Sequence, residues 1–426
     1  MNKLKIAIIG SGSTYTPELI EGIIKRKDKM SVGRLSLMDI DSRKLNIVGA
    51  LTERMIKHAG LDCDVVMTED YDAALEGADF VFVQIRVGKL PARILDEKIP
   101  LKYNLIGQET VGIGGFFKAL RTIPVLIYIA ERMEKLCPSA WMLNFTNPSG
   151  ICTQAILDYT KVKMLGLCNA PIRMLLSIEK AFESFQIEQG YIGLNHLGFI
   201  TSIKSNGHDF LHEAIEGDDK LLSALDGQMG FSKEIIRTVR AVPSYYLHYF
   251  ISPRKTLAKL LTDKQTRGEE CISIEEKLLD MYSNIDLYTK PEELSQRGGA
   301  MYSEVACSLA ESIYTDNGGI HVVNSYNNGA IPFMADDDVV ETRAVVNATG
   351  AKTLPADVIG GEYIKGIMQA VKAYERLTVK AALEGSRDAA ISALMINPLV
   401  GDHDTAENCF KEMLESHRKY LPNFYR

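Results

Sequence analysis

The sequence lacks several features that mark particular classes of protein. Its 48 basic and 55 acidic residues are spread along the chain with no basic block, which argues against a nucleic-acid-binding surface. No uninterrupted apolar run reaches the length of a membrane span. The first strand pattern begins at Lys5, so we expect no secretory signal peptide. Only seven cysteines are present and they form no close pair, so we expect free thiols and a cytoplasmic protein.

The length and periodicity of the chain predict two domains. A chain of 426 residues is too long for one ordinary core, and the pattern changes near residue 190. Residues 1–190 alternate strand-like and helix-like segments, which predicts an α/β fold with a doubly wound, Rossmann-like parallel sheet. The strand-like segments are residues 5–9, 34–38, 64–67, 79–84, 141–145 and 164–167.

The second predicted domain, residues 191–426, has a mixed α+β pattern and is expected to carry catalytic and dimerisation surfaces. Residues 191–203 indicate the start of an antiparallel strand pair, and mostly helical sequence follows. Residues 255–296 are rich in charge, which favours a solvated helical insertion. No repeat or low-complexity segment interrupts the chain.

A glycine-rich turn after the first strand pattern is the most informative local feature. The strand pattern ends at Gly10 and a helix-compatible sequence begins at about Pro17, an order typical of dinucleotide-binding domains. Backbone N–H groups and the helix N-terminus of such a turn can hold a pyrophosphate. Because Tyr15 replaces the third glycine of the usual pattern, a tight turn without a ligand is the alternative. The predicted cofactor contacts here are Gly10, Gly12, Ser13 and Thr14.

Charged residues follow the second and fourth strand patterns. Asp39 ends the second pattern and is expected to accept hydrogen bonds from ribose hydroxyls. Arg86 follows the fourth pattern and is predicted to contact the cofactor, since a guanidinium can fork onto hydroxyl or phosphate oxygens. Arg93 is a further candidate for contact with a ligand, with a salt bridge to Asp96 or Glu97 as the alternative.

Later turns carry further polar candidates. Glu109 lies in a second glycine-rich turn, where a carboxylate is ordinarily a surface group. Asn147 follows the fifth strand pattern and suits either contact with a sugar or carboxamide, or a helix N-cap with Pro148 at the first helical position. The last candidates near a predicted phosphate pocket are Arg297, Gly298 and Gly299.

A thiol, an imidazole and two phenols complete the candidate set. Cys168 ends the sixth strand pattern and His196 lies in the predicted strand pair; each is ordinarily a buried core residue. Together at one open site they would hold a divalent transition metal and leave positions for a substrate. Tyr245 and Tyr246 form an aromatic cluster that is ordinarily core packing, but a phenol near a metal can serve as a base.

Together and in this order, these segments resemble glycoside hydrolase family four, the NAD-dependent glycosidases. The resemblance implies NAD⁺, Mn²⁺ or another divalent transition metal, an architecture like that of lactate and malate dehydrogenases, and a homodimer or homotetramer. It is carried by residues 9–17, Arg86-Val-Gly88, Gly107-Gln-Glu-Thr110, Asn144-Phe-Thr-Asn-Pro148, Leu167-Cys-Asn169, Asn195-His196 and Tyr246-Leu247.

The resemblance also implies a role for each candidate residue. Cys168 and His196 become the metal ligands, and Tyr246 becomes the base that removes the C2 proton, with Tyr245 open as the alternative by one position of register. Asn169 stands where α-specific members carry an aspartate, which favours the 6-phospho-β-glucosidase branch. Glu109 is implied to tune the site, and the implied substrate contacts are Arg93, Asn147 and Arg297.

The implied reaction is hydrolysis by oxidation, elimination and addition. NAD⁺ takes a hydride from C3 of the sugar, the metal stabilises the enediolate that follows, and the hydride returns after water adds at C1. The implied substrate is a phosphorylated disaccharide such as 6-phospho-cellobiose, which would give glucose 6-phosphate. The alternatives are a 6-phospho-α-glucosidase or α-galactosidase of the same family, a 2-hydroxy-acid dehydrogenase, and a nucleotide-sensing protein without turnover.

Overall fold

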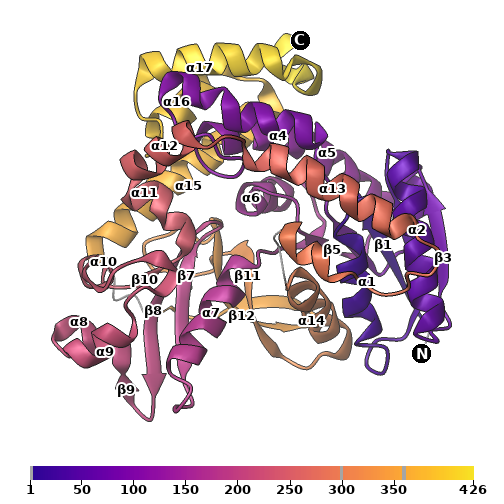
Figure 1. The fold of residues 1–426 in the computed structure, drawn as a ribbon, viewed down its shortest axis with the longest axis horizontal. Coiled ribbons are helices and arrows are strands. Elements are labelled where there is room, and N and C mark those ends of the chain that lie inside the picture. The colour runs from indigo at the N-terminus through magenta and orange to yellow at the C-terminus, as the bar shows by residue number, and fades with distance from the viewer. Residues whose placement is uncertain (1–2, 298–300, 357–360) are drawn as a thin grey trace.

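The computed structural model describes residues 3–297, 301–356 and 361–426. Its centre is a nine-stranded sheet with helices on both faces (Figure 1). Six parallel strands run in the order β3-β2-β1-β4-β5-β6, the doubly wound order, so the predicted α/β class is confirmed. All six lie where the sequence predicts strands: β1 (Leu4–Ile9), β2 (Val32–Met38), β3 (Asp64–Thr68), β4 (Phe80–Val83), β5 (Trp141–Asn144) and β6 (Lys163–Gly166).

The parallel strands pack between two apolar layers. Successive side chains of a strand point to opposite faces, so Ile6 and Ile8 join one layer and Ala7 and Ile9 the other. Because both faces are covered, these strands are largely apolar and do not alternate regularly with polar residues. The helices on the first face include α1 (Thr16–Ile24), α2 (Ser42–His58) and α14 (Tyr302–Thr315); those on the second include α3 (Tyr71–Leu75), α5 (Gly112–Leu136) and α6 (Ser149–Tyr159).

Helix α5 is unusually long and apolar. By length and composition alone it could cross a membrane, and no other helix in residues 3–297, 301–356 and 361–426 passes the same test. However, 78% of its most apolar window is buried inside the fold, as expected for a core helix. The C-terminal helices α15 (Gly361–Glu384), α16 (Arg387–Ile396) and α17 (His403–Ser416) share its core.

The second part of the chain extends the large sheet, which the sequence analysis did not predict. Strand β11 pairs antiparallel with β6, and β12 and β13 follow outward. A smaller antiparallel sheet contains the predicted strand pair, β7 and β8. The domain boundary near residue 190 stays a prediction. The bounds are β7 (Glu188–Leu194), β8 (Leu197–Ser205), β9 (His208–Asp209), β10 (Val242–Pro243), β11 (Gly319–Tyr326), β12 (Val339–Asn347) and β13 (Gly350–Thr353).

The charged segment 255–296 does not form a merely solvated insertion. Its helix α13 (Arg267–Ser283) crosses the parallel-sheet half and contacts α2 and α4 (Figure 1). Leu278, Leu279 and Tyr282 form a buried stripe, which the charges at the other positions of the helix obscure in the sequence. The remaining helices are α4 (Lys89–Lys98), α7 (Ala170–Ala181), α8 (Phe210–Glu216), α9 (Asp219–Ala224), α10 (Lys233–Val239), α11 (His248–Ile251) and α12 (Pro253–Thr262).

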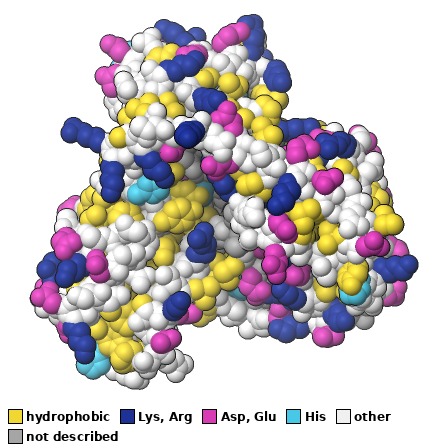
Figure 2. Space-filling view, in the orientation of Figure 1, with side chains coloured by type: hydrophobic (Ala, Val, Ile, Leu, Met, Phe, Trp, Pro, Cys, Tyr) yellow, Lys and Arg dark blue, Asp and Glu magenta, His cyan; other side chains and the backbone are white. Residues whose placement is uncertain are grey.

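The outer surface carries charges of both signs. In the face shown in Figure 2, basic and acidic side chains are interspersed. This agrees with the near balance of 48 basic and 55 acidic residues in the whole chain.

Candidate active site

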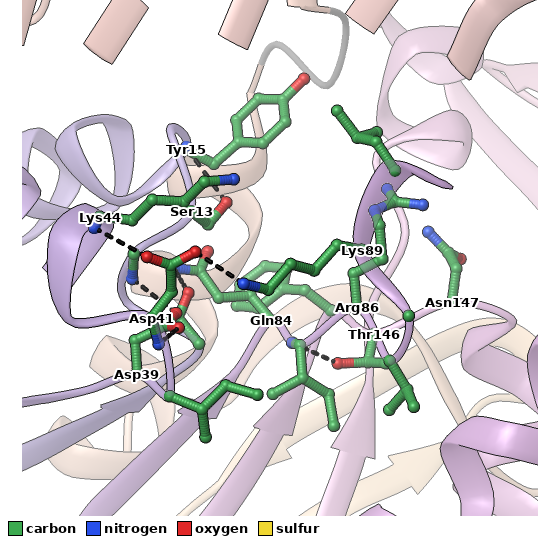
Figure 3. A pocket seen from close by; sticks show the side chains of 18 of the residues that line it. Ser13, Tyr15, Asp39, Asp41, Lys44, Gln84, Arg86, Lys89, Thr146 and Asn147 are labelled. Atoms are coloured by element: carbon green, nitrogen blue, oxygen red, sulfur yellow. Dashed lines mark hydrogen bonds and ion pairs between the residues drawn. The ribbon is translucent and has the colours of Figure 1, made fainter. Parts of the chain in front are cut away.

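A cavity of about 520 Å³ lies at the carboxyl ends of β1, β2 and β4 (Figure 3). The strand order reverses between β1 and β4, and doubly wound sheets bind their ligands at such a point. Gly10, Gly12 and Ser13 line the cavity as predicted, whereas the Thr14 side chain is fully buried. Gly10 has a φ of +87°, and a Cβ there would come within 3.0 Å of the Gln84 backbone. Glycine is therefore required here by the positive φ and by the backbone that follows β4.

Asp39 anchors the glycine turn from the end of β2. Its carboxylate accepts hydrogen bonds from the backbone N–H of Gly12 at 2.8 Å and of Asp41 at 2.9 Å. Burial raises the pKa of Asp39, although both hydrogen bonds favour its ionised form. Asp41 is in turn held by the Lys89 ammonium at 2.7 Å, across the cavity in Figure 3. This arrangement fits the ribose of a dinucleotide whose phosphates lie at the turn.

A buried cluster of three cations surrounds Glu109. Its carboxylate pairs with Lys118 at 2.7 Å, with Arg93 at 2.8 Å and with Arg86. Burial opposes ionisation, but these cations hold the pKa of Glu109 well below its usual range. Burial and the neighbouring Arg86 lower the pKa of Lys118 to about 7. The expectation that Glu109 would be an ordinary surface group is therefore wrong, since the fold encloses the turn that carries it.

Arg93 is engaged by two carboxylates. Besides Glu109, it pairs with Glu97 one turn along α4 at 2.7 Å, which is one of the salt bridges that the sequence left open. Arg86 and Lys118 line the cavity, whereas Arg93 lies behind them with 9% of its side chain exposed. The predicted contact of Arg93 with a substrate stays a prediction, and it would act from behind Glu109.

Asn147 lines the cavity and is not a helix cap. Pro148 is the N-cap residue of α6, and the peptide bond between Asn147 and Pro148 is cis, so the predicted capping arrangement is wrong by one residue. The N-terminal N–H of Ser149 is satisfied instead by the side-chain oxygen of Asn195, at 2.9 Å. The buried side-chain oxygen of Asn147 has no hydrogen-bond partner in the described structure, which leaves it for a ligand.

Cys168 and His196 are both buried, on turns that follow β6 and β7. Burial, with the nearby Glu341 carboxylate, raises the pKa of the Cys168 thiol, which accepts a hydrogen bond from Ala170 N–H at 3.4 Å. Burial and Lys118 lower the pKa of His196 to about 3, so its imidazole is neutral, the form that binds metals. Its Nδ1 atom has no hydrogen-bond partner in the described structure.

Cys168 and His196 stay the predicted ligands of a divalent cation that also binds a substrate. Within the described ranges, no group of three or more His, Cys, Asp or Glu could hold a metal. A cation bound by Cys168 and His196 would therefore keep open coordination positions, as catalytic metal sites do. Asn169, the next candidate, begins α7 directly after the thiol and is half-buried.

Tyr246 contacts the predicted metal ligand His196. The two rings lie 4.1 Å apart between centroids, and Tyr245 lies 4.4 Å from Tyr246 on its other side. Burial raises the pKa of Tyr245, whereas a hydrogen bond with Tyr246 lowers it. Tyr246 contacts His196 and the charge of Cys168 also raises the pKa of Tyr245, so each phenol lies near one predicted metal ligand.

Helix α13 covers the glycine turn. The Tyr282 hydroxyl donates to the carbonyl oxygen of Thr14 at 2.8 Å, and Glu275 pairs with Lys44 of α2. Arg297, which follows this helix, lines the cavity with its guanidinium 5.7 Å from the centre of the Tyr15 ring. Tyr15 thus forms part of the cavity wall at the place of the missing third glycine.

The cavity gathers part of the candidate set, since Cys168, His196 and Tyr246 are not among its lining residues, and the structure adds three residues that the sequence analysis missed. Arg297 lies over the cofactor turn, and its predicted substrate contact stays a prediction; Gly298 and Gly299 lie outside the described residues. Lys118 was missed although a lysine in an apolar helix is a signal for a buried ion pair. Glu275 and Tyr282 give no such signal in the sequence. They lie in a charged segment whose composition predicts a solvated insertion.

Comparisons with known proteins match almost the whole chain. A model described as "Family 4 glycosyl hydrolase" matches residues 5–184, and a model of that family's C-terminal domain matches residues 191–400. A probable 6-phospho-beta-glucosidase of Bacillus subtilis (strain 168) is 42% identical, with 99% of this chain and 98% of that protein covered. A 6-phospho-beta-glucosidase of Escherichia coli (strain K12) is 38% identical, with 99% and 97% covered.

A solved structure also matches closely. It is the 6-phospho-beta glucosidase from Thermotoga maritima with manganese, NAD⁺ and glucose-6-phosphate. That protein is 35% identical to this chain with a TM-score of 0.89, and 98% of this chain and 99% of that chain are covered. The similarity therefore includes both the nucleotide-binding half and the half that carries His196 and Tyr246.

Proposed function

The chain belongs to family 4 of the glycosyl hydrolases, and from this membership we propose that it hydrolyses 6-phospho-β-glucosides to glucose 6-phosphate and an aglycone. The observation that carries the proposal is the similarity over nearly the full chain to 6-phospho-β-glucosidases, one of them seen with manganese, NAD⁺ and glucose-6-phosphate. NAD⁺ and Mn²⁺ are the proposed cofactors. The phosphorylated disaccharide is the proposed substrate.

Residues of the cavity, and the buried His196 outside its lining, support this proposal. The glycine turn can bring its own backbone close to a ligand, and Asp39 lies at the edge of this turn. Buried polar atoms of Asn147 and His196 have no hydrogen-bond partner in the described structure. NAD⁺ would supply reversible removal of a hydride from the sugar, and a divalent cation would stabilise negative charge on sugar oxygens. We propose that Cys168 and His196 hold the cation.

Tyr246 is the proposed base for the C2 proton of the sugar. A phenol loses its proton more readily near a cation, and its ring already contacts His196. Arg86 lines the cavity beside Glu109, and its positive charge favours the negative charge that develops on the sugar. Asn147 is proposed to orient sugar hydroxyls through its unpartnered oxygen.

A substrate panel tests the proposed function. With NAD⁺ and Mn²⁺ present, p-nitrophenol release is expected from the 6-phospho-β-glucoside and not from the unphosphorylated β-glucoside. No net NADH should form, because the hydride returns to the sugar, and a chelator should abolish the activity. Faster release from a 6-phospho-α-glucoside would favour the α-specific alternative, and steady accumulation of NADH would favour a dehydrogenase.

We also propose that the enzyme works in the cytoplasm as a homodimer or homotetramer. All seven cysteines are free, as a reducing compartment favours. The proposed substrate is a phosphorylated sugar, which is charged and does not cross membranes unaided. Light scattering coupled to size-exclusion chromatography checks the oligomeric state, and a monomeric mass would contradict this part of the proposal.

Helix α13 is expected to help retain the cofactor. Replacing Tyr282 with phenylalanine removes the hydrogen bond to Thr14 without a change of charge or ring packing. One such hydrogen bond contributes about 0.5–1.5 kcal/mol, so the Kd for NAD⁺ should rise roughly two- to tenfold in isothermal titration calorimetry. The matched control is Tyr288→Phe, whose ring is 47% exposed and stacks on His58. Equal Kd values for the two variants would contradict a role of α13 in retention.

A further inference from the structure

A buried carboxylate lies behind the proposed metal site and has no part in the mechanism above. Glu341 on β12 is 1% exposed and accepts three hydrogen bonds from side chains. The Tyr191 hydroxyl donates at 2.8 Å, Asn324 Nδ2 at 3.0 Å and Asn195 Nδ2 at 3.2 Å. Three neutral donors on one carboxylate form a hydrogen-bond network, which fixes the side chains that take part.

Asn195 connects this network to both proposed metal ligands. Its Oδ1 accepts from the Ser149 N–H at 2.9 Å, and its side chain lies close enough to the Cys168 thiol to lower the pKa of that thiol. It also directly precedes His196 in the two-residue turn between β7 and β8. His196 has a φ of +66°, a left-handed conformation that a non-glycine residue adopts only where the surroundings hold it.

A carboxylate at position 341 suits this task better than an amide. Both of its oxygens accept, so it satisfies Tyr191 on one side and the two asparagines on the other. A glutamine would present its own NH₂ group to one of these donors and leave that donor unpaired. The network would then loosen at Asn195, between the thiol and the turn that carries the imidazole.

We propose that Glu341 is a positioning residue that, through Asn195, holds the Cys168 sulfur and the His196 imidazole in the arrangement that binds a divalent cation. This inference rests on the proposed function, in which these two residues are the metal ligands. Outer-shell groups of this kind orient the ligands of metal sites, and their loss typically weakens metal binding by about 10- to 100-fold.

The test compares metal binding by the purified full-length protein and the Glu341→Gln variant. The Kd for Mn²⁺, from electron paramagnetic resonance of the free ion, is expected to rise about 10- to 100-fold. The charge-transfer band from the thiolate in the Co²⁺-loaded protein should weaken as well. Because the network lies apart from the glycine turn, the Kd for NAD⁺ should change less than about twofold, a change below 0.5 kcal/mol.

Thr342→Val is the matched control on the same strand. Thr342 is also 1% exposed, and its hydroxyl donates to the backbone carbonyl of Tyr191 at 3.0 Å. This variant loses a buried hydrogen bond beside the network but leaves Glu341 and Asn195 unchanged. It should melt at a lower temperature than the parent and bind Mn²⁺ as tightly as the parent does. Weaker Mn²⁺ binding by this control to the same extent as by Glu341→Gln would overturn the proposal.

Parent-like Mn²⁺ binding and an unchanged Co²⁺ band in the Glu341→Gln variant would also overturn it. If that variant does not fold, Tyr191→Phe takes its place, because it removes only one of the three donors. A severalfold loss of Mn²⁺ affinity in Tyr191→Phe would support the proposal, and parent-like affinity would overturn it. The Cys168→Ser variant separates this inference from its premise. The proposed metal site itself would be contradicted if the Co²⁺-loaded parent shows no thiolate charge-transfer band. It would also be contradicted if that band survives in the Cys168→Ser variant.

Discussion

Replacing Tyr246 with phenylalanine is expected to lower kcat for the 6-phospho-β-glucoside about a thousandfold, within the 10²- to 10⁴-fold contribution of a general base. The phenyl ring keeps the contacts with His196 and Tyr245, so the fold and the proposed metal ligands should be preserved. The Kd for NAD⁺ should therefore stay close to that of the parent. Initial rates of p-nitrophenol release measure the loss.

A second readout identifies the step that fails. In D₂O the parent should exchange the C2 proton of glucose 6-phosphate with solvent, and the Tyr246→Phe variant should not, because the proton acceptor is missing. The neighbouring Tyr245→Phe is the control, and its exchange rate should remain within about tenfold of the parent's, less than the loss of a general base. If Tyr245→Phe loses the exchange and Tyr246→Phe keeps it, the roles of the two tyrosines are reversed.

Replacing Asp96 with asparagine is expected to destabilise the protein by about 3–5 kcal/mol, the cost of leaving one partner of a buried ion pair without compensation. Asp96 and Arg121 are both fully buried, and two hydrogen bonds join them, one of them at 2.9 Å. His417 lies 3.0 Å from the same carboxylate. Arg121 also donates to the carbonyl oxygen of Val87 at 2.9 Å, so the pair supports the loop that carries Arg86. Chemical denaturation and the melting temperature measure the change.

The surface offers a matched ion pair of the same kind. Asp72 and Arg132 are also joined by two hydrogen bonds, but their side chains are 40% and 28% exposed. Water can solvate Arg132 when its partner is neutralised, so Asp72→Asn should leave the unfolding transition almost where it is. Comparable shifts for the two variants would show that burial does not set the cost at Asp96.

Much of the nucleotide-binding half is predictable because its signals are local. The six parallel strands are short apolar runs that end in turn residues, and their order follows from right-handed crossovers through helices. Gly10 and Asp39 directly follow a strand, Arg86 and Asn147 follow one within three residues, and parallel strands bring such residues to one edge of the sheet. Their common position at the cavity was therefore predictable without knowledge of any contact.

The surroundings of these residues were not predictable in the same way. Glu109 is an unremarkable carboxylate in the sequence, and only the fold brings Arg86, Arg93 and Lys118 around it. Whether Arg93 contacts Glu97 or a substrate likewise depends on how α4 lies against the turn that carries Glu109. The pKa directions of these groups follow from burial, which depends on segments distant in the chain.

The sequence by itself determined the fold class, the dinucleotide turn and the family, because strand periodicity, glycine turns and strand-end residues are encoded within short segments. Only the tertiary structure decided how the two parts of the chain meet. It placed α13 over the glycine turn through Tyr282 and Thr14, 268 positions apart, and Glu341 beside Asn195, 146 positions apart. No local pattern specifies such pairs, because each depends on the packing of whole elements around a shared core.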